Sequence, residues 1–334
     1  MRTGMDGGGS RVGRVLLWMG LGLAVTMAGS LMLGVHAYSP AAVWAAVTAF
    51  DGSDTHHILW DLRLPRAVVA PVVGAALGVA GVLLQTLVRN RIAAPDILGL
   101  NAGAALAVVV ASTWFGIDAM IGLSAAAAIG ALATAFVVYG IAATGGTMTP
   151  ARTVLAGVTL AGLMSSLAQL VLSTDEATLD ELLFWLAGAF EGRPLALVGA
   201  SAWLFLLGGI AAALVARPLD ALLADDDMAR GLGIHLFRVR TLAFVAIAAL
   251  TGGAVAVAGP VGFIGLVVPH MARGLVGLRH RDQIAGAALL GALFALIADI
   301  LARYLVYPTE APVGVVTALM GGPVLLILLR RRAA

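Results

Sequence analysis

Polar side chains inside long apolar stretches are the first candidates for chemistry in this sequence. Gln85, Asn101 and Gln169 lie in such stretches, and in another Asp299 precedes Arg303 by four positions. Residues four apart share one face of a helix, so Asp299 and Arg303 can form an ion pair. Ionisable groups are costly in apolar surroundings and often serve a function there. Taken alone, this pair is suited to proton or ion coupling.

No group of residues has the spacing of a catalytic or metal-binding motif. The phosphate-binding sequence Gly-x-x-x-x-Gly-Lys-Ser/Thr is absent, as is cysteine, which argues against P-loop ATP hydrolysis and thiolate metal sites. Adjacent histidines such as His56 and His57 are more often incidental than metal ligands. His270, which follows Pro269, is more often a structural hydrogen-bonding group than a proton relay. We therefore expect no enzyme and no metal or cofactor in this chain.

The composition predicts an all-α polytopic membrane protein. Of 334 residues, 61% are hydrophobic and 11% are charged, whereas soluble domains carry about 25% charged residues. A membrane span needs about 20 apolar residues. We predict a disordered cytoplasmic head over residues 1–14 and a single transmembrane domain over 15–334. About ten spans fit this domain: 15–35, 66–88, 97–115, 119–143, 152–172, 197–216, 239–258, 261–276, 283–302 and 313–329.

The arginines predict the orientation of these spans. With the N-terminus inside, the inner segments hold 16 of the 20 basic residues, all of them arginine. Such a bias is expected of cytoplasmic segments, so both termini are predicted to be cytoplasmic. The four exceptions on the outer side are Arg63, Arg66, Arg193 and Arg303.

The largest inner loop, residues 217–238, contains signals for two short helices at the membrane surface. Pro218 can start one helix. One of the aspartates at 225–227 can cap a second, which Gly231 or Gly233 can end. A solvated connector without these helices is the alternative.

Two long blocks of sequence resemble the FecCD family, the permease subunits of bacterial ABC importers for iron–siderophores, haem and cobalamin. The first block comprises residues 62–67, 74–85 and 89–103, and the second comprises 259–273, 298–303 and 310–323. The resemblance runs from about residue 60 to the C-terminus. It implies a type II ABC importer permease architecture with ten spans per subunit, in the bacterial inner membrane.

The resemblance also implies the partners. They are a second permease subunit, identical or different, two cytoplasmic ATPase subunits that hold ATP and Mg²⁺, and a periplasmic or lipid-anchored substrate-binding protein. Membrane lipid surrounds the chain, and no nucleic acid is expected.

Family roles fall on three groups of residues. Outer arginines that pair with glutamates of the binding protein match Arg63, Arg66 and Arg303, for which anchoring of span ends is the alternative. The helices that couple the permease to the ATPase match Asp227, Met228, Ala229, Arg230, Gly231, Leu232, Gly233 and Ile234. The path or gate matches Asn90, Ile92, Ser173 and Thr174, with simple packing as the alternative. Arg91 stands where the family usually has proline, which leaves the geometry of that turn open.

Two questions stay open from sequence. An ion-coupled secondary transporter is the rival class, although the spans hold few charges near their centres. Ferric siderophore is the first expectation for the cargo, with haem and cobalamin as alternatives.

Overall fold

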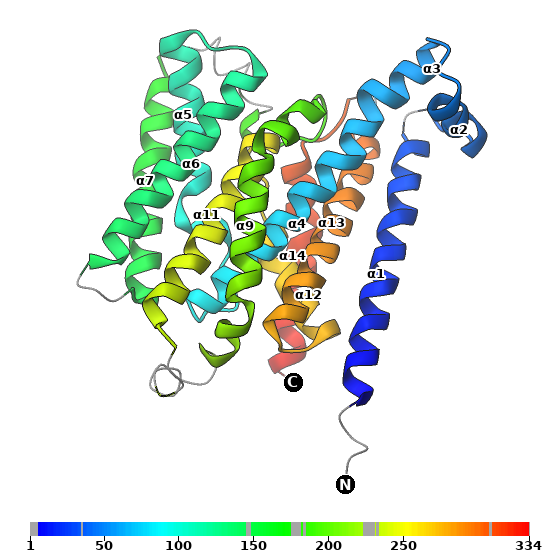
Figure 1. The fold of residues 1–334 in the computed structure, drawn as a ribbon. Helices are drawn as coiled ribbons and strands as arrows, with labels where there is room; N and C mark the ends of the chain where they lie inside the picture. The colour runs from blue at the N-terminus through cyan, green and yellow to red at the C-terminus, as the bar shows by residue number, and fades with distance from the viewer. Residues whose placement is uncertain are drawn as a thin grey trace.

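A computed structural model describes residues 6–34, 36–144, 148–174, 182, 185–222, 231, 234–306 and 309–333, and these residues form a bundle of helices without strands (Figure 1). The elements are α1 (Asp6–Met32), α2 (Pro40–Thr48), α3 (Asp54–His57), η1 (Ile58–Arg63), α4 (Leu64–Leu87), η2 (Pro95–Leu98), α5 (Leu100–Phe115), α6 (Met120–Ala142), α7 (Pro150–Leu172), α9 (Leu195–Leu222), α11 (Leu236–Ala258), α12 (Ile264–Val276), α13 (His280–Leu305) and α14 (Val313–Ala333).

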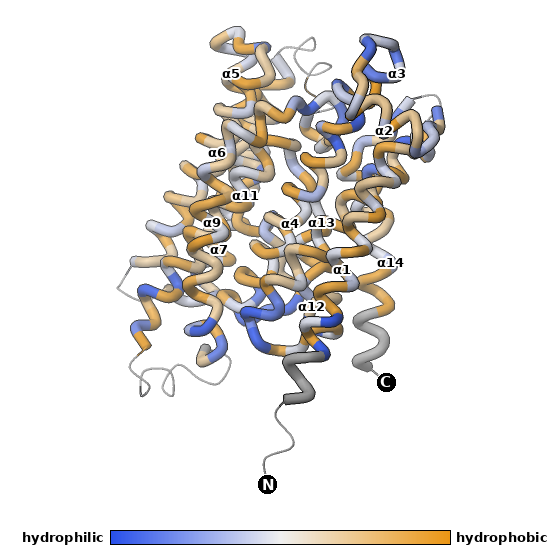
Figure 2. The backbone as a smooth tube through the Cα atoms, turned by 45° about the vertical axis from the view of Figure 1, so that its right-hand side comes forward, coloured by the Kyte–Doolittle hydropathy of each residue, from blue (hydrophilic) through white to orange (hydrophobic). Residues whose placement is uncertain are grey.

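The helices confirm the predicted spans. Among the described residues, seven helices are long and apolar enough to cross a membrane, and α5, α12 and α14 supply three shorter apolar helices. Together they coincide with the ten predicted segments. Apolar residues dominate the middle of the bundle, and most hydrophilic residues lie toward its two ends (Figure 2). The chain is therefore a polytopic helical membrane protein.

The two ends of the bundle are named here by the chain termini. Helix α1 begins and α14 ends at one end, called the terminal end, while α2 and α3 lie at the other, called the far end (Figure 1). This arrangement agrees with an even number of spans.

Three boundaries differ from the prediction. Helix α1 begins at Asp6, within the predicted disordered head. The second span begins at Asp54 and runs for 34 residues. Pro65 has no N–H to donate to a helix. The π-helical turn η1 lies directly before α4, and the helix therefore continues through Pro65 without a break. Pro218 does not start a helix in the inner loop. It lies inside α9, which continues to Leu222.

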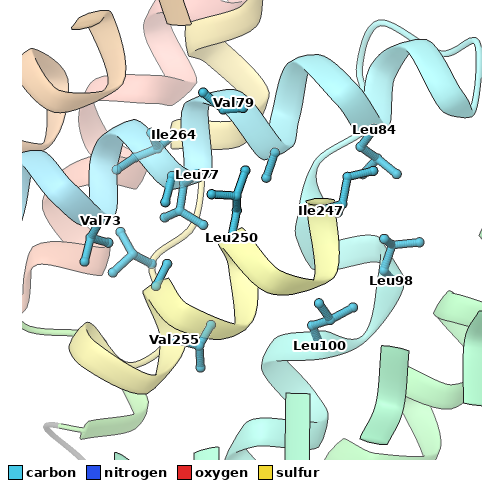
Figure 3. Packing of buried hydrophobic residues seen from close by; sticks show 14 of the residues in the cluster. Val73, Leu77, Val79, Leu84, Leu98, Leu100, Ile247, Leu250, Val255 and Ile264 are labelled. Atoms are coloured by element: carbon cyan, nitrogen blue, oxygen red, sulfur yellow. The ribbon is translucent and has the colours of Figure 1, made fainter. Parts of the chain in front are cut away.

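Helices α4 and α11 form the centre of the bundle. Within the most apolar window of each, 83% of residues are buried, against 6% in α1. Val73 and Leu77 of α4 pack near Leu250 and Val255 of α11, as Figure 3 shows. Close van der Waals packing of these side chains holds the central pair together, while α1 lies at the edge.

Two glycines let α4 approach α13 closely. A Cβ on Gly74 would lie 2.1 Å from the carbonyl oxygen of Gly291, and one on Gly78 would lie 2.5 Å from that of Ala287. Both carbonyls belong to α13. Small residues allow such approaches in lipid, where the hydrophobic effect does not drive helix pairing. The close α4–α13 pair then positions the charged groups at the far end.

Candidate functional site

The far end holds a buried ionic cluster built on Asp299 of α13. Arg66 of α4 donates from Nε and Nη2 to Asp299 Oδ1, at 3.0 and 2.8 Å. Arg303, one turn after Asp299, donates from Nη2 to Asp299 Oδ2 at 2.5 Å. Asp299 is 1% exposed. One carboxylate thus pairs with two arginines, and the pair predicted from the four-residue spacing is confirmed.

Arg303 also joins α13 to the first helix. Its Nη1 donates to the carbonyl oxygens of Ser30 and Leu33, both at 2.7 Å, and its Nη2 donates to Ser30 Oγ at 2.8 Å. Ser30 is fully buried. Since the rest of α1 is mostly exposed, these bonds are a principal attachment of its far end.

Arg63 is held in the same region by main-chain oxygens. Its Nη1 donates to the carbonyl oxygen of Leu31 at 2.8 Å, and its Nη2 donates to that of His36. Its guanidinium lies 4.5 Å from the centre of the Tyr38 ring, a cation–π distance.

All three arginines matched to binding-protein docking are therefore buried, at 7% exposure for Arg63 and Arg66 and 3% for Arg303. Each is bonded within the chain, which fits the alternative that they anchor span ends. The docking role stays a prediction.

Glu310 is the outermost member of the cluster. Its Oε2 lies 2.6 Å from Arg66 Nη2, and its side chain is 20% exposed. Glu191 lies near it in the wall of a small cavity that Arg66 and Asp299 also line. Burial raises the pKa of Glu191, and the negative charge of Glu310 raises it further. Sequence reasoning assigned no role to Glu310 or Ser30, because each lies far along the chain from its arginine.

Arg193, the fourth outer arginine, lines a separate far-end cavity of about 350 Å³ with Asp118, Trp185 and Glu191. It is 5% exposed and donates from Nε to the carbonyl oxygen of Ala189 at 3.3 Å. Burial lowers its pKa to about 10. Among the described residues no carboxylate forms an ion pair with it.

The predicted path residues do not lie together. Asn90 and Ile92 are exposed in the turn after α4, at the terminal end, where Asn90 Oδ1 accepts from the Ile92 N–H at 3.0 Å. Ser173 and Thr174 are exposed at the end of α7, at the far end (Figure 1). A single constriction cannot include both pairs within one chain, because α4 and α7 end on opposite sides.

The turn after α4 forms without the family's usual proline. Arg89 has a φ of 50°, and the Asn90 N–H donates to the Gln85 carbonyl oxygen at 3.1 Å. Gln85 also donates from Nε2 to the carbonyl oxygens of Ala93 and Leu266, and accepts from Arg273 Nη2. These bonds tie the turn to α12 and give Gln85 a structural role.

The coupling stretch is described at two positions. Gly231 is exposed, and Ile234 is half-buried just before α11. The other six matched residues lie outside the described part of the chain: Asp227, Met228, Ala229, Arg230, Leu232 and Gly233. Across the described ranges, no group of three or more acidic, histidine or cysteine side chains could hold a metal ion.

Comparisons with known proteins extend over nearly the whole chain. The model of the FecCD transport family matches residues 22–331. A probable siderophore transport system permease protein of Bacillus subtilis, YfiZ, is 39% identical over 93% of this chain and 94% of its own length. The ferric enterobactin permease FepD of Escherichia coli is 38% identical over 93% of each chain.

The similarity includes a cobalamin importer and a solved structure. The cobalamin permease BtuC of Halobacterium salinarum is 35% identical over 93% of this chain and 86% of its own. A solved chain described as an inward-facing conformation of an ABC transporter of metal-chelate type superposes with a TM-score of 0.83 at 28% identity, covering 96% of this chain and 99% of that one. With ten apolar helices in the described part of the chain and a family match over almost its full length, the chain is a member of the FecCD transport family and has the fold of an ABC transporter permease.

Proposed function

We propose that this chain is the membrane permease subunit of a binding-protein-dependent importer whose cargo is a ferric siderophore. The observation that carries the proposal is the full-length similarity to permeases for siderophores, enterobactin and ferric citrate, at 37–39% identity. Cobalamin permeases follow at 35%. The path would carry a bulky chelate, and the binding protein would select it.

The energy would come from partner subunits. A second permease, identical or different, would complete the path, and two ATPase subunits would bind ATP and Mg²⁺ on the cytoplasmic side. The arginine distribution favours a cytoplasmic location for both termini in the inner membrane. Asp299, which would be the natural ion carrier in a secondary transporter, is bonded to two arginines, and this disfavours ion coupling.

Docking of the binding protein at the far end would require an exchange of partners, since Arg66 is already paired. Glu310 is the more exposed of the two carboxylate partners of Arg66, at 20% against 1% for Asp299, so a glutamate of the binding protein would replace Glu310 while Asp299 kept its bonds. The exchange would replace one carboxylate partner of Arg66 by another, so the number of ion pairs at Arg66 would stay the same. Arg63 is bonded to main-chain oxygens, and Arg303 is bonded to main-chain oxygens and to Asp299. These two arginines would stabilise the docking face without contacting the binding protein.

The remaining roles follow the family match. The stretch from Asp227 to Ile234 would contact the ATPase at the terminal end. Asn90 and Ile92 in the turn after α4 would narrow the inner mouth of the path. Ser173 and Thr174 would line its outer mouth.

The cargo is tested by uptake into proteoliposomes that contain the chain with its ATPase and binding protein. Radiolabelled iron presented as a ferric siderophore should accumulate, and a tenfold excess of cobalamin should not compete. Accumulation of cobalamin with no uptake of the iron chelate would assign the chain to the cobalamin branch instead. Titration of the isolated binding protein with each chelate gives an independent measure of the same preference.

A further inference from the structure

A cavity of about 780 Å³ lies at the terminal end, on the side of the bundle where α1 stands. Its walls come from the start of α1, the end of α9 and the turn between α12 and α13. Its cationic side chains are Arg217, Arg279 and Arg281. None of the roles given above to docking, path or ATPase coupling uses these arginines.

The three arginines offer charge that the described part of the chain does not neutralise. All three are exposed, and no carboxylate of the described residues forms an ion pair with any of them. The two acidic residues of the lining, Asp220 and Asp282, have other interactions.

Asp220 is bound to His280. Its Oδ1 accepts from the main-chain N–H of His280 at 2.8 Å and lies 2.7 Å from His280 Nδ1. Asp282 lies in the first turn of α13, where a carboxylate offsets the positive end of the helix dipole. Three arginines against two aspartates leave the lining with a formal charge of +1, which matches one phosphodiester.

The lining of the cavity also contains apolar side chains. They are Val12 and Leu16 of α1, and Val276 and Leu278 at the α12–α13 turn. A soluble anion would gain nothing from these side chains, whereas the upper acyl chain and glycerol of a lipid would bury apolar surface against them. Basic pockets between membrane helices at the cytoplasmic surface are suited to anionic headgroups.

The peripheral position of α1 gives the acyl chains a route. Only 6% of its apolar window is buried in the chain, and Leu17 and Leu21 are exposed. A lipid headgroup in the cavity would therefore continue into the bilayer beside α1.

We propose that this cavity binds one anionic phospholipid, with its phosphate among Arg217, Arg279 and Arg281 and its glycerol against Val12 and Leu16. The lipid would fasten the terminal end of α1 to the α12–α13 turn, as Arg303 fastens the far end. The proposal rests on the membrane location of the chain and is independent of its cargo.

The test is native mass spectrometry of the purified chain titrated with phosphatidylglycerol or phosphatidylcholine. The wild type should bind one phosphatidylglycerol in preference to phosphatidylcholine. Each arginine near an anionic surface contributes about 1 kcal/mol, so Arg279→Gln with Arg281→Gln should weaken phosphatidylglycerol binding roughly thirtyfold. The matched control, Arg91→Gln with Arg238→Gln, removes two exposed arginines outside the cavity lining and should leave binding unchanged.

Two further measurements distinguish binding of a whole lipid from binding of a phosphate group alone. Leu16→Asn keeps all three arginines and the lining charge of +1, and it should also weaken binding, because the lipid loses an apolar contact. Soluble glycerol 3-phosphate at millimolar concentration should not displace the lipid. Equal binding of the two lipids, wild-type binding by the Arg279/Arg281 variant, or displacement by glycerol 3-phosphate would each overturn the proposal. Loss of ATPase binding without loss of lipid binding in that variant would assign the arginines to the partner protein.

Discussion

Asp299 and Arg66 join α13 to α4 through two hydrogen bonds to one carboxylate oxygen, between residues 233 positions apart in the sequence. Arg303 occupies the other oxygen. This carboxylate therefore bridges two buried cations at the point where three helices, α1, α4 and α13, meet, and Glu310 supplies the second negative charge.

Removal of the Asp299 carboxylate should destabilise the protein strongly. In Asp299→Ala, Arg66 keeps Glu310 and Arg303 keeps its main-chain acceptors, but both lose their central anion. Breaking a buried ion pair in this way costs about 3–5 kcal/mol. Thermal unfolding in detergent measures the loss. Asp61→Asn, an exposed carboxylate at the same end, is the control and should change stability little; an equally small effect of Asp299→Ala would contradict the account.

Neutralisation of Glu310 should favour docking of the binding protein. In Glu310→Gln, Arg66 loses the anion with which a docking glutamate would compete. The concentration of loaded binding protein that half-maximally stimulates ATP hydrolysis should therefore fall several-fold. Asp54→Asn, which removes an exposed charge from α3, controls for a general change in surface potential. If Glu310→Gln needs the same or a higher concentration of loaded binding protein for half-maximal stimulation, a docking glutamate does not replace Glu310 at Arg66.

The close approach of α4 and α13 should not tolerate a methyl group. In Gly74→Ala the Cβ would lie 2.1 Å from the Gly291 carbonyl oxygen, so one helix must shift. Overpacking of this kind costs about 1–3 kcal/mol. Gly20→Ala in α1, where no atom lies within 4 Å of the new Cβ, is the matched control. Unfolding temperatures of the two variants should separate, and a Gly74→Ala protein as stable as Gly20→Ala would disprove close packing here.

Glu191 should make the far end less stable as the pH rises. Its pKa is raised by burial and by Glu310, so the folded state favours the neutral acid. That contribution is present below the unfolded pKa and is lost as the pH rises through the folded pKa. Glu191→Gln should therefore unfold at a higher temperature than the wild type at about pH 7.5, and the difference should vanish at about pH 4. A difference that persists at the lower pH would point to lost packing rather than charge.

The sequence predicted the helices well because the bilayer imposes one strong constraint, about 20 apolar residues for each crossing. It also predicted the Asp299–Arg303 pair, since a four-residue spacing is local information. It could not predict Arg66–Asp299 or Arg303–Ser30, because those contacts depend on how distant helices pack.

Other differences have local causes. The π-helical turn before Pro65 extended a helix into a predicted loop. Ser173 and Thr174 lie at the end of the bundle opposite Asn90 and Ile92, so the two pairs would line the path at its two mouths, and that role stays a prediction.

ATP-driven import by this chain is measured as uptake of a ferric siderophore into proteoliposomes that contain the chain and its ATPase, with loaded binding protein outside. Iron should accumulate when ATP is inside, and none should accumulate when ATP is replaced by a non-hydrolysable analogue or the ATPase is omitted. Uptake at an undiminished rate by the chain alone, driven by an ion gradient without ATP, would contradict ATP-driven import.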